Sequence, residues 1–234
     1  RITADAARGI TVTARLHRIP EPDRDRTPSS FTSRGPGRNG ALKPDVSAPG
    51  QLILSAYLGT GDRGARFSGT SMAAPFAAGA AAVARAAWRD RGRPLDAASA
   101  ARLLVSTADP RALRLSADDP DAPPLTQSGG GAAAPAAAAA AATLLAADGR
   151  AAIDLGVRAL SAPVTVPVAV ALTNVSTRTL TYRLAPRLRE AGDDRGAVEM
   201  PAATAVAAPG ERVTATLAVA LDPARFIGWP MAGG

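Results

Sequence analysis

The sequence predicts an α/β domain with a parallel sheet, followed by a smaller antiparallel β-sandwich. Three observations support this fold class. Residues 52–57 form a short apolar run bounded by turn-forming residues, as buried strands of α/β sheets do. Residues 72–91 form a long alanine-rich stretch that is typical of a helix. The final third contains short alternating segments at close turn spacing, which is typical of antiparallel sandwiches.

The first 28 residues contain one predicted strand and one connector. Residues 10–16 alternate apolar and polar side chains, which predicts a strand. Residues 20–28 are charged and rich in proline, as connectors are. His17 is the single histidine of the chain and lies between the two. It is a candidate general base, but its position favours a surface histidine near the end of a strand.

Residues 31–50 are predicted to form a turn-rich loop that leads into a short strand. Phe31–Gly40 contains three glycines, and residues 46–48 form the centre of a strand that Pro49-Gly50 ends. Asp45 is an acidic residue in this stretch, and it could be considered as a catalytic acid. Hydrogen bonding within the loop is the interpretation that we favour for it.

Ser71 follows Gly69-Thr70 and directly precedes the alanine-rich stretch. A serine in this position lies at a helix N-terminus, where free backbone N–H groups and the positive end of the helix dipole favour negative charge. In acyl transfer such an N–H group donates to the oxyanion of the tetrahedral intermediate. Serine is also a common N-cap, so a purely structural capping role for Ser71 is the alternative.

The alanine-rich helix is expected to be slim and buried against sheet backbone. Pro75 falls in its first turn, where the missing N–H does little harm. Gly79 costs about 1 kcal/mol of helix propensity relative to alanine, so we attribute it to close packing. Gly92 is expected to end the helix.

Two further helices are predicted. One begins after Asp96, a suitable N-cap, and closes near Asp109-Pro110. The other is alanine-rich and covers residues 136–147. The loop between them carries an acidic cluster, which could bind calcium through carboxylate oxygens. The cluster lacks the regular spacing of an EF-hand loop, so a solvated acidic loop is favoured; its members are Asp118, Asp119 and Asp121.

Composition excludes several classes of function. The chain has no cysteine, which rules out disulfides, zinc–thiolate sites and a cysteine nucleophile. The net charge of +7 could suggest nucleic acid, but Lys43 is the only lysine, the arginines are scattered and aromatic residues make up 3%. We therefore predict no nucleic-acid partner. No apolar run has the length and side chains of a membrane span; the nearest is residues 132–147.

Three sequence blocks occur in a fixed order: Phe31-Thr32-Ser33-Arg34-Gly35-Pro36, Leu42-Lys43-Pro44-Asp45-Val46-Ser47-Ala48-Pro49-Gly50 and Phe67-Ser68-Gly69-Thr70-Ser71-Met72-Ala73-Ala74-Pro75. Their order and spacing resemble the subtilisin-like serine proteases (subtilases, peptidase family S8). The resemblance covers residues 29–147, in which Gln127–Gly131 is similar to the Gln-Gly-Ala-Gly element of the family. It departs at Phe76, where the family usually has a histidine that is not catalytic.

The resemblance implies a serine endopeptidase that hydrolyses peptide bonds in protein or peptide substrates. Ser71 is then the catalytic nucleophile, and its N–H together with Thr70 forms the oxyanion region. The triad Asp and His and the oxyanion asparagine are implied to lie upstream of Arg1. His17 lacks the glycine-containing motif of the family histidine, and Asn39 lies in the wrong block. We therefore expect this chain alone to be inactive.

The expected organisation has three parts. Residues 1–28 are the tail of an inserted domain or a linker, residues 29–147 the C-terminal part of the catalytic domain, and residues 148–234 a fibronectin-III-like β-sandwich that ends before it is complete. The resemblance also implies a secreted or cell-wall-associated protein. It includes calcium among the family's cofactors, but the sequence identifies no ligands for it here, and it does not define a substrate preference.

Two other functions are weighed. A pseudoprotease, or a cell-surface structural or binding module, would keep the fold without the activity; the intact Gly69-Thr70-Ser71 argues against it. An α/β-hydrolase would need a Gly-x-Ser-x-Gly elbow, and here Met72-Ala73 follows the serine, so the second glycine is missing.

Overall fold

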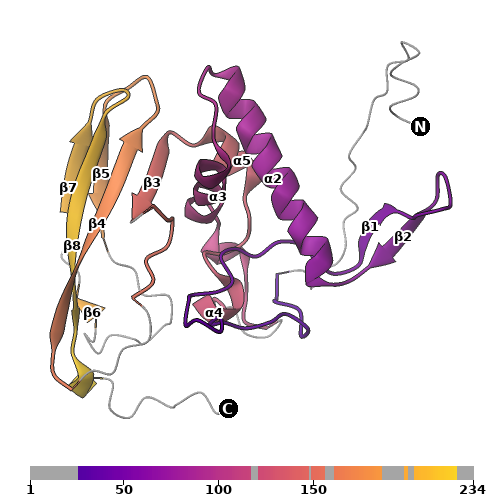
Figure 1. Cartoon of the computed structure of the whole chain (residues 1–234), viewed down its shortest axis with the longest axis horizontal. Coiled ribbons are helices and arrows are strands. Elements are labelled where there is room, and N and C mark those ends of the chain that lie inside the picture. The colour runs from indigo at the N-terminus through magenta and orange to yellow at the C-terminus, as the bar shows by residue number, and fades with distance from the viewer. Residues whose placement is uncertain are drawn as a thin grey trace.

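The computed structural model describes residues 26–116, 121–147, 149–155, 161–185, 198–199 and 203–225. The helices α2, α3 and α5 occupy the middle of the molecule (Figure 1). A hairpin of β1 and β2 projects on one side of them, and the antiparallel strands of the final third lie on the other. The predicted strand at 10–16, His17, Asp118 and Asp119 lie outside the described residues.

The hairpin consists of β1 (Ile53–Ala56) and β2 (Gly64–Phe67), which pair in antiparallel fashion. The prediction that residues 52–57 form a buried strand of a parallel sheet is wrong. Leu54 is 54% exposed, and among the described strands β1 pairs with β2 alone. The run is apolar on both faces, and such a pattern does not reveal whether anything covers the strand.

The predicted long helix is confirmed as α2 (Thr70–Asp90). Its buried side chains are Ala80, Ala84 and Trp88, which recur every four residues and so lie on one face. This face packs against α3 and α5 in the core of the helical part. Trp88 is 2% exposed, and its indole Nε1–H donates to the carbonyl of Ala138 at 3.0 Å.

Two details of the expectation for α2 are wrong. The helix is not buried on all sides, since Phe76 is 40% and Val83 53% exposed. Within the described part of the chain Gly79 is not required for close packing, because a Cβ built there would have no described neighbour within 4 Å. Small side chains on a helix allow another helix or strand to approach closely, but they do not ensure that such an element is present. The described partners of α2 lie on one side of it only.

The second predicted helix is confirmed as α3 (Ala97–Ser106), with the short helix η1 (Pro110–Ala112) after it. The Asp96 carboxylate caps α3 by accepting a hydrogen bond from the Ser99 N–H at 2.6 Å. Leu103 is fully buried among α2, α3 and α5. The sequence pattern therefore located the start of this helix. The face predicted from Ala101, Leu104 and Val105 is only partly right, because Leu104 is buried together with Ala100 and Leu103, whereas Ala101 is exposed.

The last predicted helix is wrong in its second half. After the short helix α4 (Leu125–Ser128), α5 covers Pro135–Ala140, and residues Thr143–Ala147 form strand β3. β3 pairs along its whole length with β4 (Val164–Asn174). Helix propensity favours alanine by only tenths of a kcal/mol per residue, which is less than a full ladder of strand pairing provides.

The antiparallel strands predicted for the final third are confirmed. One sheet has the order β3-β4-β8-β6, and a second consists of β5 and β7. The new strands are β5 (Leu180–Leu184), β6 (Val198–Glu199), β7 (Ala203–Ala207) and β8 (Arg212–Leu221), followed by the short helix η2 (Pro223–Arg225). Membership of the fibronectin-III-like class stays a prediction.

The sheets share an apolar core. Val168, Val170 and Leu172 of β4 and Leu217 of β8 are buried, and Tyr182 of β5 packs against them. Within the described part of the chain, parallel pairing occurs at one isolated bridge, between Ser47 and Ala132. The predicted parallel sheet is thus represented in the described residues by this bridge.

Candidate active site

Ser71 is the second residue of α2, and it is exposed. Gly69 holds the N-cap position, and no side chain caps the helix. The Ser71 hydroxyl makes no hydrogen bond to any residue of the described ranges. The alternative that Ser71 is the N-cap is therefore wrong, and its hydroxyl has no structural task in the described part of the chain.

The backbone around Ser71 favours negative charge. The N–H groups of Thr70 and Ser71 lie in the first turn, where an α-helix provides no carbonyl partner. The first turn also contains no acidic residue that would neutralise the positive end of the helix dipole. An oxyanion formed beside Ser71 would find unpaired donors and a favourable potential.

The turn before Ser71 is held by the second sequence block. The Gly69 N–H donates to the carbonyl of Gly50 at 2.7 Å, and the Leu52 N–H donates to the Ser68 Oγ at 2.8 Å. A Cβ on Gly50 would lie 2.8 Å from the Gly69 carbonyl oxygen, so a larger residue does not fit there. The sequence identified Pro49-Gly50 only as a strand end and gave no sign of this support.

The second block is itself fixed by the glycine segment near residue 130. The Ser47 N–H donates to Gly131 at 2.8 Å, and the Gly130 N–H donates to the Asp45 carbonyl at 3.0 Å. Gly129 has φ 59°, and a Cβ there would lie 2.5 Å from the Asp45 carbonyl carbon. The Asp45 carboxylate pairs with Lys43. These contacts support the structural interpretation of Asp45.

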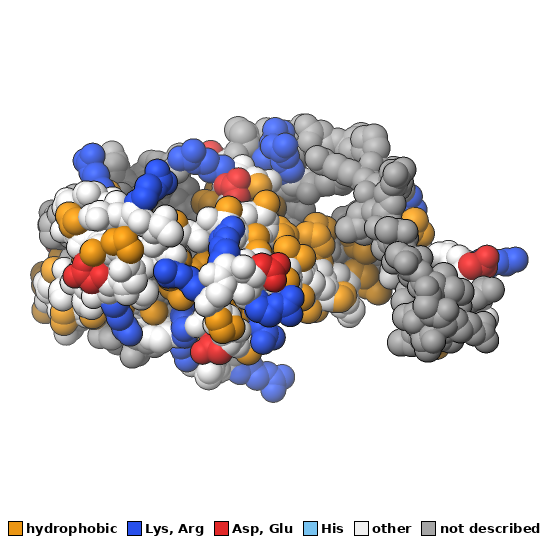
Figure 2. Space-filling view, turned by 90° about the horizontal axis from the view of Figure 1, so that it is seen from above, with side chains coloured by type: hydrophobic (Ala, Val, Ile, Leu, Met, Phe, Trp, Pro, Cys, Tyr) orange, Lys and Arg blue, Asp and Glu red, His pale blue; other side chains and the backbone are white. Residues whose placement is uncertain are grey.

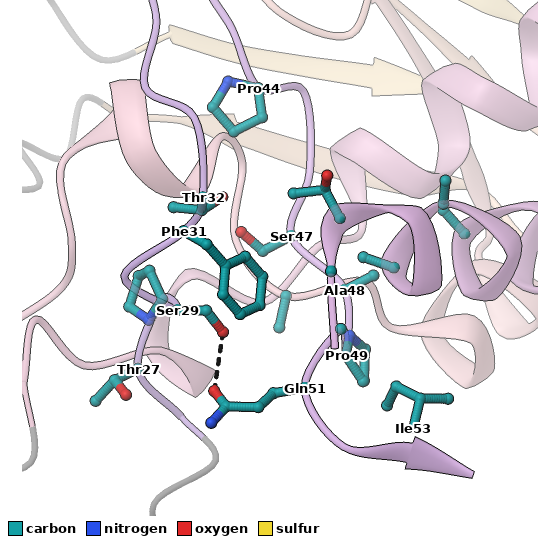
Figure 3. Close-up of a pocket in the computed structure, with 18 of the residues that line it drawn as sticks. Thr27, Ser29, Phe31, Thr32, Pro44, Ser47, Ala48, Pro49, Gln51 and Ile53 are labelled. Carbon is teal, nitrogen blue, oxygen red and sulfur yellow. Dashed lines mark hydrogen bonds between the residues drawn. The ribbon is translucent and has the colours of Figure 1, made fainter. Parts of the chain in front are cut away.

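The first block joins the same assembly. The Gly35 N–H donates to the Thr126 carbonyl at 2.7 Å, and a Cβ on Gly35 would collide with the Lys43 carbonyl oxygen at 2.1 Å. Ser29 donates through Oγ to the Gln51 Oε1 at 3.0 Å (Figure 3). The first and second blocks therefore contact each other and the segment 126–131, which lies far later in the sequence, and the second block contacts the turn that carries Ser71.

A cavity of about 720 Å³ lies between these blocks and the first half of α2. Phe31, Ser47, Ala48 and Pro49 line it (Figure 3), and Thr70 reaches it from the helix. Ser71 is not among its lining residues. The cavity adjoins the turn before Ser71, because Gly69 and Thr70 line it.

The described residues contain no cluster of three or more His, Cys, Asp or Glu side chains able to hold a metal ion. Within the same ranges no helix is both long and apolar enough to cross a membrane. On the face shown in Figure 2, Lys and Arg side chains are spread out with acidic side chains among them. This distribution agrees with the scattered arginines of the sequence.

The profile of the subtilase family matches residues 4–123, just over half of the 234 residues, and this range contains all three blocks and Ser71. The chain belongs to the subtilase family.

Several subtilases from plants and bacteria are similar to this chain. Tripeptidyl-peptidase 2 of Arabidopsis thaliana is 35% identical over 97 residues, which is 42% of this chain and 7% of that protein. A PII-type proteinase of Lactococcus lactis subsp. cremoris is 44% identical over 66 residues, 28% of this chain and 3% of that protein. Subtilisin-like protease SBT3.6 of Arabidopsis thaliana is 48% identical over 67 residues, 26% of this chain and 9% of that protein. The chain thus spans less than a tenth of each of these relatives.

Proposed function

We propose that this chain is the C-terminal part of the catalytic domain of a subtilisin-like serine endopeptidase, with Ser71 as the nucleophile. One observation carries the proposal: Ser71 is exposed in the first turn of α2, and its hydroxyl neither caps the helix nor bonds to any described residue. Membership of the subtilase family supports it.

The proposed chemistry is acyl transfer. A histidine oriented by an aspartate, both contributed by a part of the full protein that precedes Arg1, removes the proton from the Ser71 Oγ. The oxygen then attacks the carbonyl carbon of a peptide bond, and the Ser71 N–H, assisted by Thr70, stabilises the oxyanion. The amine leaves with the proton from the histidine, and water hydrolyses the acyl-enzyme.

The remaining parts of the proposal rest on resemblance. The substrate class is a protein or peptide, and the protein acts after secretion or at the cell wall. Residues 148–234 form the fibronectin-III-like appendage that follows the catalytic domain in many large subtilases. The antiparallel sheets described for this region are compatible with that assignment.

The nucleophile is tested in the longer protein that includes the sequence preceding Arg1. Ser71→Ala is expected to lower kcat/KM for an unstructured protein substrate by roughly 10⁴-fold or more, because no other group forms the acyl-enzyme. Ser161→Ala is the matched control, since Ser161 is exposed and lies beyond the family match. Equal activity of Ser71→Ala and the unchanged protein would disprove the assignment.

The chain of residues 1–234 is tested separately. It is expected not to react with a fluorophosphonate probe at Ser71, since reaction at a useful rate needs the histidine base. Labelling of Ser71 at a protease-like rate in this chain would show that the upstream residues are not required. If the longer protein is also unreactive and lacks a triad histidine or aspartate, the pseudoprotease alternative is correct.

A further inference from the structure

The chain has two asparagines, and the structure places them in opposite environments. Asn39 is exposed and precedes Gly40, whereas Asn174 is 0% exposed and precedes Val175. Asparagine is among the residues that degrade chemically in proteins. It does so when the backbone nitrogen of the following residue attacks the side-chain Cγ. The exposure of these two atoms and their geometry therefore decide which asparagine reacts.

The turn around Asn39 brings the reacting atoms together. The Ala41 N–H donates to the Asn39 Oδ1 at 3.2 Å, and this bond closes a ring of atoms that contains both the Asn39 Cγ and the Gly40 nitrogen. The N–H group also polarises the Cγ=O bond and stabilises the oxyanion that forms on attack. Gly40 has no Cβ to shield its nitrogen. The Asn39 Nδ2, which is the leaving group, makes no hydrogen bond to any described residue.

One contact in the same turn opposes the reaction. The Gly40 N–H donates to the Gly37 carbonyl at 2.8 Å, and the nitrogen must lose this bond before it attacks. The turn is exposed at Arg38 and Asn39. Exposed turns open locally at a low cost in free energy, so this hydrogen bond slows the reaction without blocking it.

Asn174 has a similar turn but is protected. Its Oδ1 also accepts a hydrogen bond from the N–H two residues later, that of Ser176, at 2.9 Å. Its Nδ2, however, donates to two carbonyls at 2.7 and 2.9 Å. The nitrogen that would attack belongs to Val175, whose N–H donates to the Ala142 carbonyl at 2.9 Å. Reaction there requires this buried corner to unfold, so Asn174 is an internal control in the same molecule.

We infer that Asn39 is a site of spontaneous deamidation. The Gly40 nitrogen bonds to the Asn39 Cγ and gives up its proton, the Cγ–Nδ2 bond breaks, and Nδ2 takes up a proton and leaves as ammonia. Water then opens the resulting succinimide ring at either of its carbonyls. Opening at Cγ gives aspartate. Opening at the backbone carbonyl gives isoaspartate, in which the main chain continues through the former side chain.

Both products change the connection between the first and second sequence blocks. The Asn39 Oδ1 and the Lys43 Cγ lie 3.2 and 3.7 Å from the position of a Cβ on Gly37, so the two side chains are neighbours. A carboxylate at residue 39 competes with Asp45 for the Lys43 ammonium group. Isoaspartate also adds a methylene group to the backbone between Gly35 and Lys43, which pack together without room for a Cβ.

Ageing of the folded chain tests the site. The chain of residues 1–234 is incubated in mildly alkaline buffer, and its proteolytic peptides are followed by mass spectrometry. Asn39 is expected to convert roughly tenfold or more faster than Asn174, because only the exposed turn opens readily. Protein L-isoaspartyl methyltransferase should then transfer labelled methyl groups to the aged chain, since this enzyme modifies isoaspartate. Asn39→Gln is the matched variant and should remove the labelling, because its longer side chain disfavours the ring closure.

Three results would overturn the inference. Equal conversion of the two asparagines in the folded chain would show that exposure and the turn do not select Asn39. Conversion of Asn39 in urea but not in the folded chain would show that the hydrogen bond between Gly40 and Gly37 blocks the reaction. Aspartate as the sole product, without methyl transfer, would exclude the succinimide route.

Discussion

At the scale of single residues, Leu52 shows how the turn before Ser71 is held. Its φ of 53° lies in the left-handed region, which leucine rarely adopts. This conformation costs about 1–2 kcal/mol. In return the Leu52 N–H donates to the Ser68 Oγ at 2.8 Å, three residues before Ser71.

Leu52→Gly is expected to raise the free energy of unfolding by about 1 kcal/mol, because glycine adopts positive φ without strain. Leu54→Gly in β1 is the matched control and should lower it by about 1 kcal/mol, since that position does not have positive φ. Urea denaturation measures both. If both variants changed the free energy of unfolding in the same direction, Leu52 would not be strained.

Asn174 is a second residue whose role is visible only in the structure. It is 0% exposed, and its Nδ2 donates to the carbonyls of Arg178 and Ala207 at 2.7 and 2.9 Å. Asn174→Ala is expected to cost about 2–4 kcal/mol, because two carbonyls lose their donor. Ser176→Ala, which removes one hydroxyl at the same corner, should cost about 1 kcal/mol. If thermal unfolding showed the same loss of stability for both variants, the Asn174 amide would not have this role in pairing the two carbonyls.

At the scale of elements, α2 contains a glycine that it does not need. Gly79→Ala is expected to stabilise the chain by about 1 kcal/mol, since the new methyl group meets no neighbour in the described part of the chain and alanine favours the helix. Gly129→Ala is the control and should destabilise, because Gly129 has φ 59° and backbone atoms lie 2.5 Å from the new Cβ. Circular dichroism melts of both variants test this, and a destabilising Gly79→Ala would show that the space is occupied.

The N-cap of α3 provides a pH dependence. The Ser99 backbone N–H that bonds to the carboxylate lowers the pKa of Asp96 from its usual value of 3.8. A lowered folded-state pKa means that the contribution of Asp96 to stability is present above pH 3.8 and is lost as the pH falls below it. Asp96→Asn keeps a good cap but does not titrate. At low pH the melting temperature of the unchanged chain should therefore drop below that of Asp96→Asn. If the melting temperatures of the two proteins change with pH in parallel, the capping role of the Asp96 carboxylate is contradicted.

At the scale of the whole molecule, exposed apolar side chains gather on the hairpin and on α2. Leu58 is 95%, Leu54 54% and Val83 53% exposed. Exposed apolar surface of this kind promotes association. Leu58→Lys with Val83→Lys is expected to reduce light scattering of concentrated solutions with little change in melting temperature. Leu103→Lys is the contrast, because Leu103 is fully buried and its replacement should unfold the helical core.

The helical part and the sheets are joined through β3. Leu144 of β3 and Val175, which follows β4, pack against the core of α2, α3 and α5, whereas Ala147 of β3 belongs to the core of the sheets. Strand β3, which the sequence pattern wrongly predicted as part of a helix, therefore connects the two cores. The division at residue 148 stays a prediction.

The sequence by itself determined the features that depend on local chemistry. The helix over Thr70–Asp90 and the cap at Asp96 follow from short-range patterns, and the order of three sequence blocks indicated the family. The assignment of Ser71 as the nucleophile rests on the order of three blocks and stays a prediction. Local patterns suffice for these because propensity, capping and turn chemistry act over a few residues.

Only the tertiary structure decided which surfaces are covered. Among the described residues it showed that β1 is exposed, that Gly79 has no packing neighbour, that residues 143–147 form a strand, and that Gly50 and Ser68 hold the turn before Ser71. The strand and the turn depend on partners far away in the chain, and the exposed positions depend on the lack of such a partner among the described residues. An apolar side chain is more stable when it is buried. Which element buries it depends on long-range packing, and short-range sequence patterns do not contain that information.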